Sequence, residues 1–143
     1  MRALFDVNAL LALFDEAHAF HGSLRAWWHD NQGSGEWATC PLTQNGFVRI
    51  MSQPRYLQSR TPAEALTALR TGVDQPGHEF WPDDVSIADK GLFSPANILG
   101  PNQITDVYLL GLAVKHGGRL VTFDRGLPLK AVRGAEPLHL VSL

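Results

Sequence analysis

The sequence predicts an α/β fold built around a mainly parallel sheet. Short apolar runs alternate along the chain with longer segments of helical periodicity, which is typical of strands joined by helical crossovers. Two of the apolar runs end in an aspartate. The chain has 143 residues, of which 45% are hydrophobic and 18% charged, and this composition is that of a globular protein. We therefore expect one domain over residues 1–143.

In the first half of the chain, we expect a strand at residues 2–5, because a short apolar run stops at Asp6. Apolar residues at helical spacing then predict a helix that includes Leu10 to Phe14. The segments that follow are predicted as a helix over 18–32, a strand over 36–40 and a helix over 42–51. Pro41 separates the last two.

In the second half, the clearest helix start is Thr61-Pro62-Ala63-Glu64. Thr61 can cap the helix, Pro62 suits its first position and Glu64 completes a capping box, so we expect a helix to about Val73. The remaining predicted elements are a short strand at 79–81, a helix over 103–116 ended by two glycines, a strand at 119–123 and a last strand at 138–141. Residues 76–101, rich in proline and glycine, are predicted as loops and short elements.

The composition excludes several classes of protein. The single cysteine, Cys40, excludes an internal disulfide framework and a zinc site with several cysteines, and it fits a reducing compartment. A formal net charge of −2 excludes a generally basic, nucleic-acid-coating protein. The apolar N-terminal stretch is broken by Asp6 and Asn8, and no run is long enough for a membrane span. We expect a cytoplasmic protein with no membrane partner.

Three aspartates are the candidate catalytic residues. Asp6 and Asp124 each follow a predicted strand, and Asp106 lies near the start of the helix before the second of these strands. In parallel sheets ligands bind beyond the carboxyl ends of strands, so these carboxylates are expected to meet there. Mg²⁺ and Mn²⁺ prefer such oxygen ligands and can activate water against a phosphodiester. Each aspartate taken alone is equally compatible with a helix cap or a turn.

Three stretches, LFDVNALLAL, CPLTQNGFVRIMSQP and ITDVYLLGLAVKHGGRLVTFDRGL, resemble in order and spacing the PIN-domain ribonucleases. Within them, the chain is most similar to the VapC-type toxins of toxin–antitoxin pairs. The resemblance implies a three-layer α/β/α domain that hydrolyses RNA with Mg²⁺ or Mn²⁺. It also implies a homodimer and a VapB-like antitoxin that inserts a segment into the active-site groove.

The resemblance also implies roles for individual residues. Asp6, Asp106 and Asp124 match the metal-binding, catalytic aspartates, Asn8 matches a supporting polar residue, and Thr122 accompanies Asp124. The family's remaining acid is usually a glutamate, but Gln44 stands at its place. An amide oxygen can ligate a hard cation without contributing charge, so Gln44 is expected to be a weak metal ligand. Three other acids could replace the missing one, namely Asp83, Asp84 and Asp89.

Charge is unevenly distributed along the middle of the chain. Residues 47–70 carry four arginines and one glutamate, whereas residues 74–89 carry acids and no lysine or arginine. Candidates for RNA binding are Arg49, Arg55, Arg60 and Tyr56, because arginine suits phosphate and tyrosine can stack on a base. The alternative is a solvated surface whose arginines pair with the acidic stretch. The six histidines show no metal-binding spacing, so we expect ordinary surface or partly buried histidines.

Two other functions compete with an active ribonuclease. Gln44 is compatible with a catalytically weakened PIN domain that acts as an RNA- or protein-binding module. An aspartyl-phosphate phosphatase would also place an aspartate after the first strand. That class needs a second acid two positions later, where this chain has Asn8, so the phosphatase hypothesis is disfavoured.

Overall fold

A computed structural model describes residues 1–143, in which five parallel strands form one sheet in the order β3-β2-β1-β4-β5. Strand β1 is central, and its Leu4 pairs with Ala38 on one side and with Leu120 on the other. The strands span Ala3–Phe5 (β1), Trp37–Thr39 (β2), His78–Phe80 (β3), Arg119–Thr122 (β4) and Leu140–Ser142 (β5). Successive strands are added on one side of β1 and then on the other, so the strand order reverses between β1 and β4.

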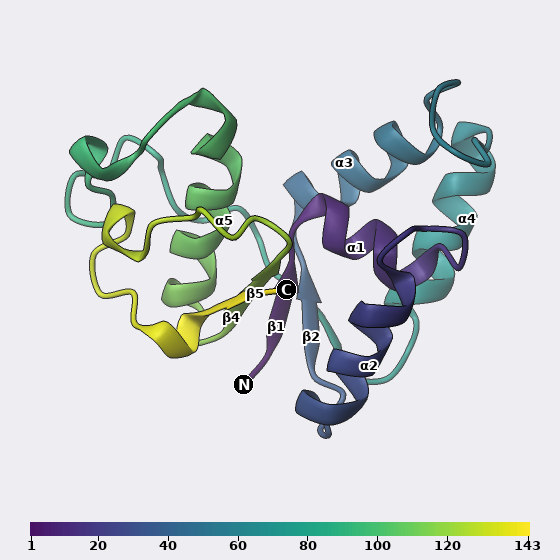
Figure 1. The fold of residues 1–143 in the computed structure, drawn as a ribbon, viewed down its shortest axis with the longest axis horizontal. Helices are drawn as coiled ribbons and strands as arrows, with labels where there is room; N and C mark the ends of the chain where they lie inside the picture. The colour runs from purple at the N-terminus through teal and green to yellow at the C-terminus, as the bar shows by residue number, and fades with distance from the viewer.

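Helices cover both faces of the sheet, as Figure 1 shows. Four helices, α1 (Val7–Phe14), α2 (His21–Asn31), α3 (Pro41–Met51) and α4 (Pro62–Val73), pack on one face, and α5 (Ile104–Lys115) packs on the other. Each face has its own buried apolar cluster. The predicted three-layer α/β/α architecture is confirmed. None of the helices has the length and apolar character needed to cross a membrane.

The helix limits follow the expected local chemistry. The Thr61 hydroxyl accepts from the backbone N–H of Glu64, and the Glu64 carboxylate accepts from the backbone N–H of Thr61, so the capping box of α4 is confirmed. After α5, Gly117 adopts a φ of +67°, a conformation that favours glycine and ends the helix.

The face covered by α5 also carries short 3₁₀ segments, namely η1 (Pro95–Asn97), η2 (Pro101–Gln103), η3 (Leu129–Ala131) and η4 (Pro137–His139). Segment η2 leads directly into α5 and so helps to fix where that helix begins. The last strand was predicted at 138–141, but it begins at Leu140 because Pro137–His139 form a 3₁₀ turn. That turn is closed by a bond from the backbone N–H of Glu136 to His139 Nδ1 (2.9 Å).

Candidate active site

The three aspartates lie at the carboxyl edge of the sheet where the strand order reverses. Asp6 directly follows β1, Asp124 comes two residues after β4, and Asp106 lies in the first turn of α5. The backbone N–H of Asp6 donates to the carbonyl oxygen of Val121 (3.1 Å), which holds the end of β1 against β4. Reversal points of this kind are the places where parallel sheets bind ligands.

Asp6 serves as the N-cap of α1 as well as a member of this acidic group. Its carboxylate is 6% exposed and accepts from the backbone N–H of Ala9 (2.7 Å). Burial raises the pKa of Asp6, and the charge of Asp124 raises it further, whereas hydrogen bonds from Thr122 and Ala9 act in the opposite direction. The helix-cap interpretation is therefore correct for Asp6, and it is compatible with a place in the acidic group.

Asp106 carries the clearest electrostatic signature of the group. Burial, followed by the charges of Asp6 and Asp124, raises the pKa of Asp106 to about 7. A carboxyl group with this pKa holds its proton near neutrality unless a cation compensates the neighbouring charges. The three aspartates thus act on one another across a shared site.

Thr122 links two of the acids. Its side chain is fully buried, its oxygen accepts from the backbone N–H of Asp124 (3.0 Å), and its hydrogen bond to Asp6 favours the ionised carboxylate. Asp124 Oδ1 also accepts from the backbone N–H of Gly126 (2.8 Å). The loop after β4 is therefore ordered by Thr122 on one side of Asp124 and by Gly126 on the other.

No basic side chain neutralises the three acids. The structure's ion pairs join Arg2 to Glu36 and Glu79, His29 to Asp30, and Lys115 and His116 to Asp84. No group of three histidine, cysteine, aspartate or glutamate side chains forms a ready-made metal cluster. Mg²⁺ commonly binds through one or two carboxylates and keeps several waters, so these uncompensated acids fit a hydrated divalent cation.

Gln44 lies near the end of β2 and is engaged there. Its amide nitrogen donates to Thr39 Oγ1 (2.9 Å), which also bonds His78 Nε2 (2.8 Å). The ring of Trp37, on the face covered by α1 to α4, contacts the His78 ring, with the ring centroids 4.6 Å apart and the ring planes inclined by 59°. The amide therefore belongs to a polar chain between β2 and β3, and no hydrogen bond connects it to the three aspartates.

Asn8 contacts a residue that sequence reasoning treated as ordinary. Its Oδ1 lies 3.0 Å from Nε2 of His18, in the turn after α1. Because His18 Nδ1 accepts from the backbone N–H of Phe20 (3.1 Å), Nε2 carries the proton and donates to Asn8. The His18 ring also stacks on the ring of Phe123, the residue that stands between Thr122 and Asp124 in the sequence. No spacing in the sequence relates His18 to Phe123, so this neighbourhood was missed.

The three substitute acids are used in different ways. Asp84 accepts from His116 (2.9 Å) and pairs with Lys115 (3.3 Å), and these interactions lower the pKa of Asp84. Asp89 Oδ1 accepts from the backbone N–H of Gly91 in a turn. Burial raises the pKa of the Cys40 thiol most, and the nearby Asp83 raises it further. None of the three acts on the pKa of Asp6 or Asp106.

The predicted RNA-binding residues lie at the end of α3 and in the segment between α3 and α4. Arg49 lies in the last turn of α3 and is exposed, as is Arg55 in the following turn. Arg60 points to Met51, and the Tyr56 hydroxyl donates to the buried Asp15 carboxylate (2.6 Å). No ion pair joins any of these arginines to residues 74–89, so pairing with the acidic stretch is wrong. Arg49 and Arg55 are exposed, which agrees with the solvated surface of the alternative.

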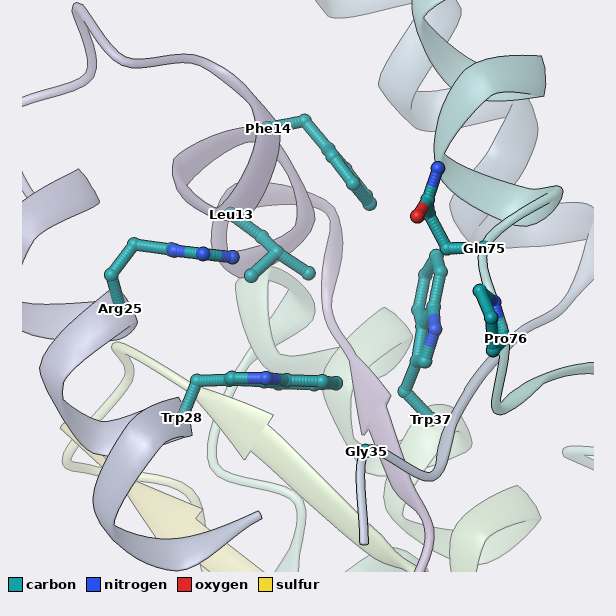
Figure 2. A pocket seen from close by; sticks show the side chains of 8 residues that line it. All are labelled: Leu13, Phe14, Arg25, Trp28, Gly35, Trp37, Gln75 and Pro76. Atoms are coloured by element: carbon teal, nitrogen blue, oxygen red, sulfur yellow. The ribbon is translucent and has the colours of Figure 1, made fainter. Parts of the chain in front are cut away.

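A separate pocket of about 300 Å³ lies at the opposite edge of the sheet (Figure 2). Leu13 and Phe14 from the end of α1 face it together with the rings of Trp28 and Trp37, and Arg25 reaches in from α2. Its other lining residues, Gly35, Gln75 and Pro76, precede β2 and β3. The pocket therefore lies where strands begin, whereas Asp6 and Asp124 lie where strands end, at the other edge of the sheet.

Comparison with known proteins agrees with this architecture. The PIN domain family matches residues 3–133. The chain belongs to the PIN-domain family. This PIN domain is 48% identical over 143 residues to Ribonuclease VapC44 of Mycobacterium tuberculosis (strain CDC 1551 / Oshkosh), with 100% of both chains covered. It is also 42% identical over 146 residues to Ribonuclease VapC38 of Mycobacterium tuberculosis (strain ATCC 25618 / H37Rv), covering 99% of each chain.

A solved structure extends the likeness of this PIN domain to three dimensions. A chain in the crystal structure of VapBC2 from Rickettsia felis, bound to a DNA fragment from their promoter, superposes with a TM-score of 0.57. The alignment covers 100% of this chain and 99% of that chain at 14% identity, so it bears on the fold alone. The family match and the full-length similarity to VapC44 and VapC38 confirm the resemblance to PIN-domain proteins of the VapC type.

Proposed function

We propose that this protein is a VapC-type toxin, a metal-dependent endoribonuclease that hydrolyses RNA phosphodiester bonds. The observation that carries the proposal is the uncompensated group of Asp6, Asp106 and Asp124 at the reversal point of the sheet, with the pKa of Asp106 raised to about 7. Membership of the PIN-domain family and full-length similarity to VapC ribonucleases support it.

The three aspartates would hold Mg²⁺ or Mn²⁺, which supplies an activated water and stabilises charge on the phosphate and the leaving oxygen. Asp6 is held rigidly by its bond to Ala9, so it offers a fixed oxygen. The hydrogen bond from Thr122 favours the ionised form of Asp6 against the burial that raises its pKa, and Thr122 also orders the backbone of Asp124. A cation bound there would favour the ionised form of Asp106, because it would offset the charges of Asp6 and Asp124 that, after burial, raise the pKa of Asp106.

The expected partners are an RNA substrate, a VapB-like antitoxin and a second copy of the chain. A hollow lined by Leu42, Ile87, Ile104 and Tyr108 supports the homodimer, because three of its apolar side chains are exposed near the starts of α3 and α5. The buried, unpaired Cys40 is compatible with action in the cytoplasm. We propose that residues 1–143 act as one domain, since both apolar clusters pack on the same sheet.

The experiment is RNA cleavage with Mg²⁺, with Mn²⁺ and with a chelator, comparing the wild type with Asp106→Asn. Asparagine keeps the shape of the side chain and removes its charge, so the variant tests electrostatics without opening a cavity. Cleavage that requires the cation and is lost in Asp106→Asn would support the proposal. Equal cleavage by both folded proteins, or cleavage that persists in the chelator, would contradict it.

A second candidate, a catalytically weakened PIN module that binds RNA or protein, is favoured by one observation. The amide of Gln44, at the place of the family's usual glutamate, is bonded to Thr39 and brings no charge. If the wild type binds RNA with the cation but never cleaves it, and Gln44→Glu gains cleavage, the weakened module is the better description.

A further inference from the structure

An aromatic hollow of about 520 Å³ lies beside Asp124, and its volume is within the usual range of ligand sites, about 300–1,000 Å³. The residues on either side of Asp124 in the chain, Phe123 and Arg125, both line it. The other lining residues are Phe20, Ser23 and Leu143. The hollow is therefore built by the chain neighbours of one of the three aspartates.

Two phenyl rings form the apolar wall of the hollow. Phe20 is 49% exposed, and its ring centroid lies 4.8 Å from that of Phe123 at an interplanar angle of 32°. The ring of His18 stacks on the second phenyl ring, that of Phe123. The two ring nitrogens of His18 bond to the backbone N–H of Phe20 and to the side chain of Asn8. The exposed ring is thereby fixed relative to α1, which suits it for stacking.

The opposite wall is cationic. Arg125 Nε donates to a main-chain oxygen of Leu143 (3.2 Å), the last residue of the sequence, which orients the side chain, and no aspartate or glutamate side chain pairs with its guanidinium group. The terminal N–H groups of arginine suit a phosphate oxygen pair. An oriented guanidinium group beside an exposed aromatic ring is complementary to a nucleotide, which combines an anionic phosphate with a flat apolar base.

We propose that Phe20, Phe123 and Arg125 form a subsite for one unpaired nucleotide of the substrate RNA, next to the phosphodiester held at the aspartates. The base stacks on Phe20, and Arg125 binds the adjoining phosphate. This inference rests on the proposed ribonuclease function. It makes the preferred substrate a single-stranded or looped RNA, because a base within a duplex cannot reach the ring.

The test is binding of a fluorescent, short, single-stranded RNA of mixed sequence in a chelator, where no cleavage can occur. Phe20→Ala is expected to weaken binding about tenfold, as loss of one stacked base does, whereas Phe20→Trp retains affinity. Phe80→Ala is the matched control, because Phe80 is equally exposed (51%) at the far edge of the sheet. Arg125→Gln should lower the salt dependence of log Kd by about 0.7.

A second arm uses a set of RNAs that each carry one abasic site, at a different position in each RNA. Wild type is expected to bind one of these RNAs more weakly than the others, and Phe20→Ala should not discriminate against it. Only base stacking on Phe20 explains that pattern. Equal RNA binding by wild type and Phe20→Ala, or an equal loss in Phe80→Ala, would overturn the subsite. So would loss of VapB-like antitoxin binding without loss of RNA binding. Failure of the ribonuclease proposal is seen separately, as absence of cation-dependent cleavage by the wild type.

Discussion

At the amino edge of the sheet Arg2 is surrounded by acidic and carbonyl partners, whereas at the carboxyl edge three aspartates have no cationic partner. Arg2 pairs with Glu79 (3.0 Å) and Glu36 (3.6 Å) and donates to the carbonyl oxygens of Gly77 (2.7 Å) and Trp37 (3.3 Å). One charge there ties β1 to β2 and β3. Charges with partners stabilise the fold, and charges without partners remain available to a ligand.

The largest expected effect separates the two edges by activity. Asp106→Asn should lower cation-dependent RNA cleavage by at least about 100-fold, since it removes an electrostatic contribution from the reaction centre. Arg2→Met should cleave at the wild-type rate, because Arg2 lies at the other edge. Initial rates at saturating cation measure both. If Arg2→Met were as inactive as Asp106→Asn while still folded, the division of roles between the edges would be wrong.

Stability should show the reverse ranking. Arg2→Met is expected to lower the free energy of unfolding by about 2 kcal/mol, because it breaks several hydrogen bonds and leaves Glu79 without its cation. Urea denaturation followed by circular dichroism measures this loss. Arg70→Met is the control, since Arg70 on exposed α4 has no ion pair, and it should change stability by less than about 0.5 kcal/mol.

The pH dependence of stability sharpens the comparison further. The pKa of Asp106 is raised from 3.8 to about 7, so the folded state holds this proton more tightly than the unfolded state. The resulting stability is complete below about pH 4 and is lost as the pH rises through about 7. Without metal, the free energy of unfolding of Asp106→Asn, relative to that of the wild type, should therefore rise by about 1–2 kcal/mol when the pH is raised from about 4 to 8.

Urea titrations in a chelator at both pH values measure this gain. Addition of Mg²⁺ at the higher pH should stabilise wild type more than the asparagine variant, because the cation takes the place of the lost proton. A constant difference between the two proteins at all pH values would show that folding does not raise the pKa of Asp106.

The smallest expected effect concerns Gln44→Glu. A glutamate has no N–H for Thr39, so the Thr39 hydroxyl must donate to the new carboxylate and His78 must donate to Thr39. The pKa of His78, which burial lowers in the wild type, should rise. An NMR titration of the His78 ring checks this. An unchanged pKa of His78 together with tighter Mg²⁺ binding would place residue 44 with the aspartates, as the sequence resemblance implies.

Local rules account for the parts of the molecule that could be predicted. Thr61 and Glu64 define their own helix start, and Asp6 and Asp124 follow apolar runs whose parallel pairing brings their ends together. Other contacts join segments that are far apart in sequence through irregular turns. Examples are the hydrogen bond between Tyr56 and buried Asp15 and the contact of His18 with Phe123. No periodicity or motif encodes such contacts, so the aromatic hollow and the hydrogen bond of Gln44 could not be predicted from the sequence.

The central position of β1 has a consequence for synthesis of the protein. Leu4 leaves the ribosome well before its partner Leu120, because the two residues lie far apart in the chain. Because Asp6 and Asp124 extend from these two strands, the acidic site is incomplete until β4 has emerged and paired with β1, however well α1 to α4 have folded. A cell producing this protein thus meets its chemistry only after β4 has been made, which leaves an interval in which an inhibitor can already be present.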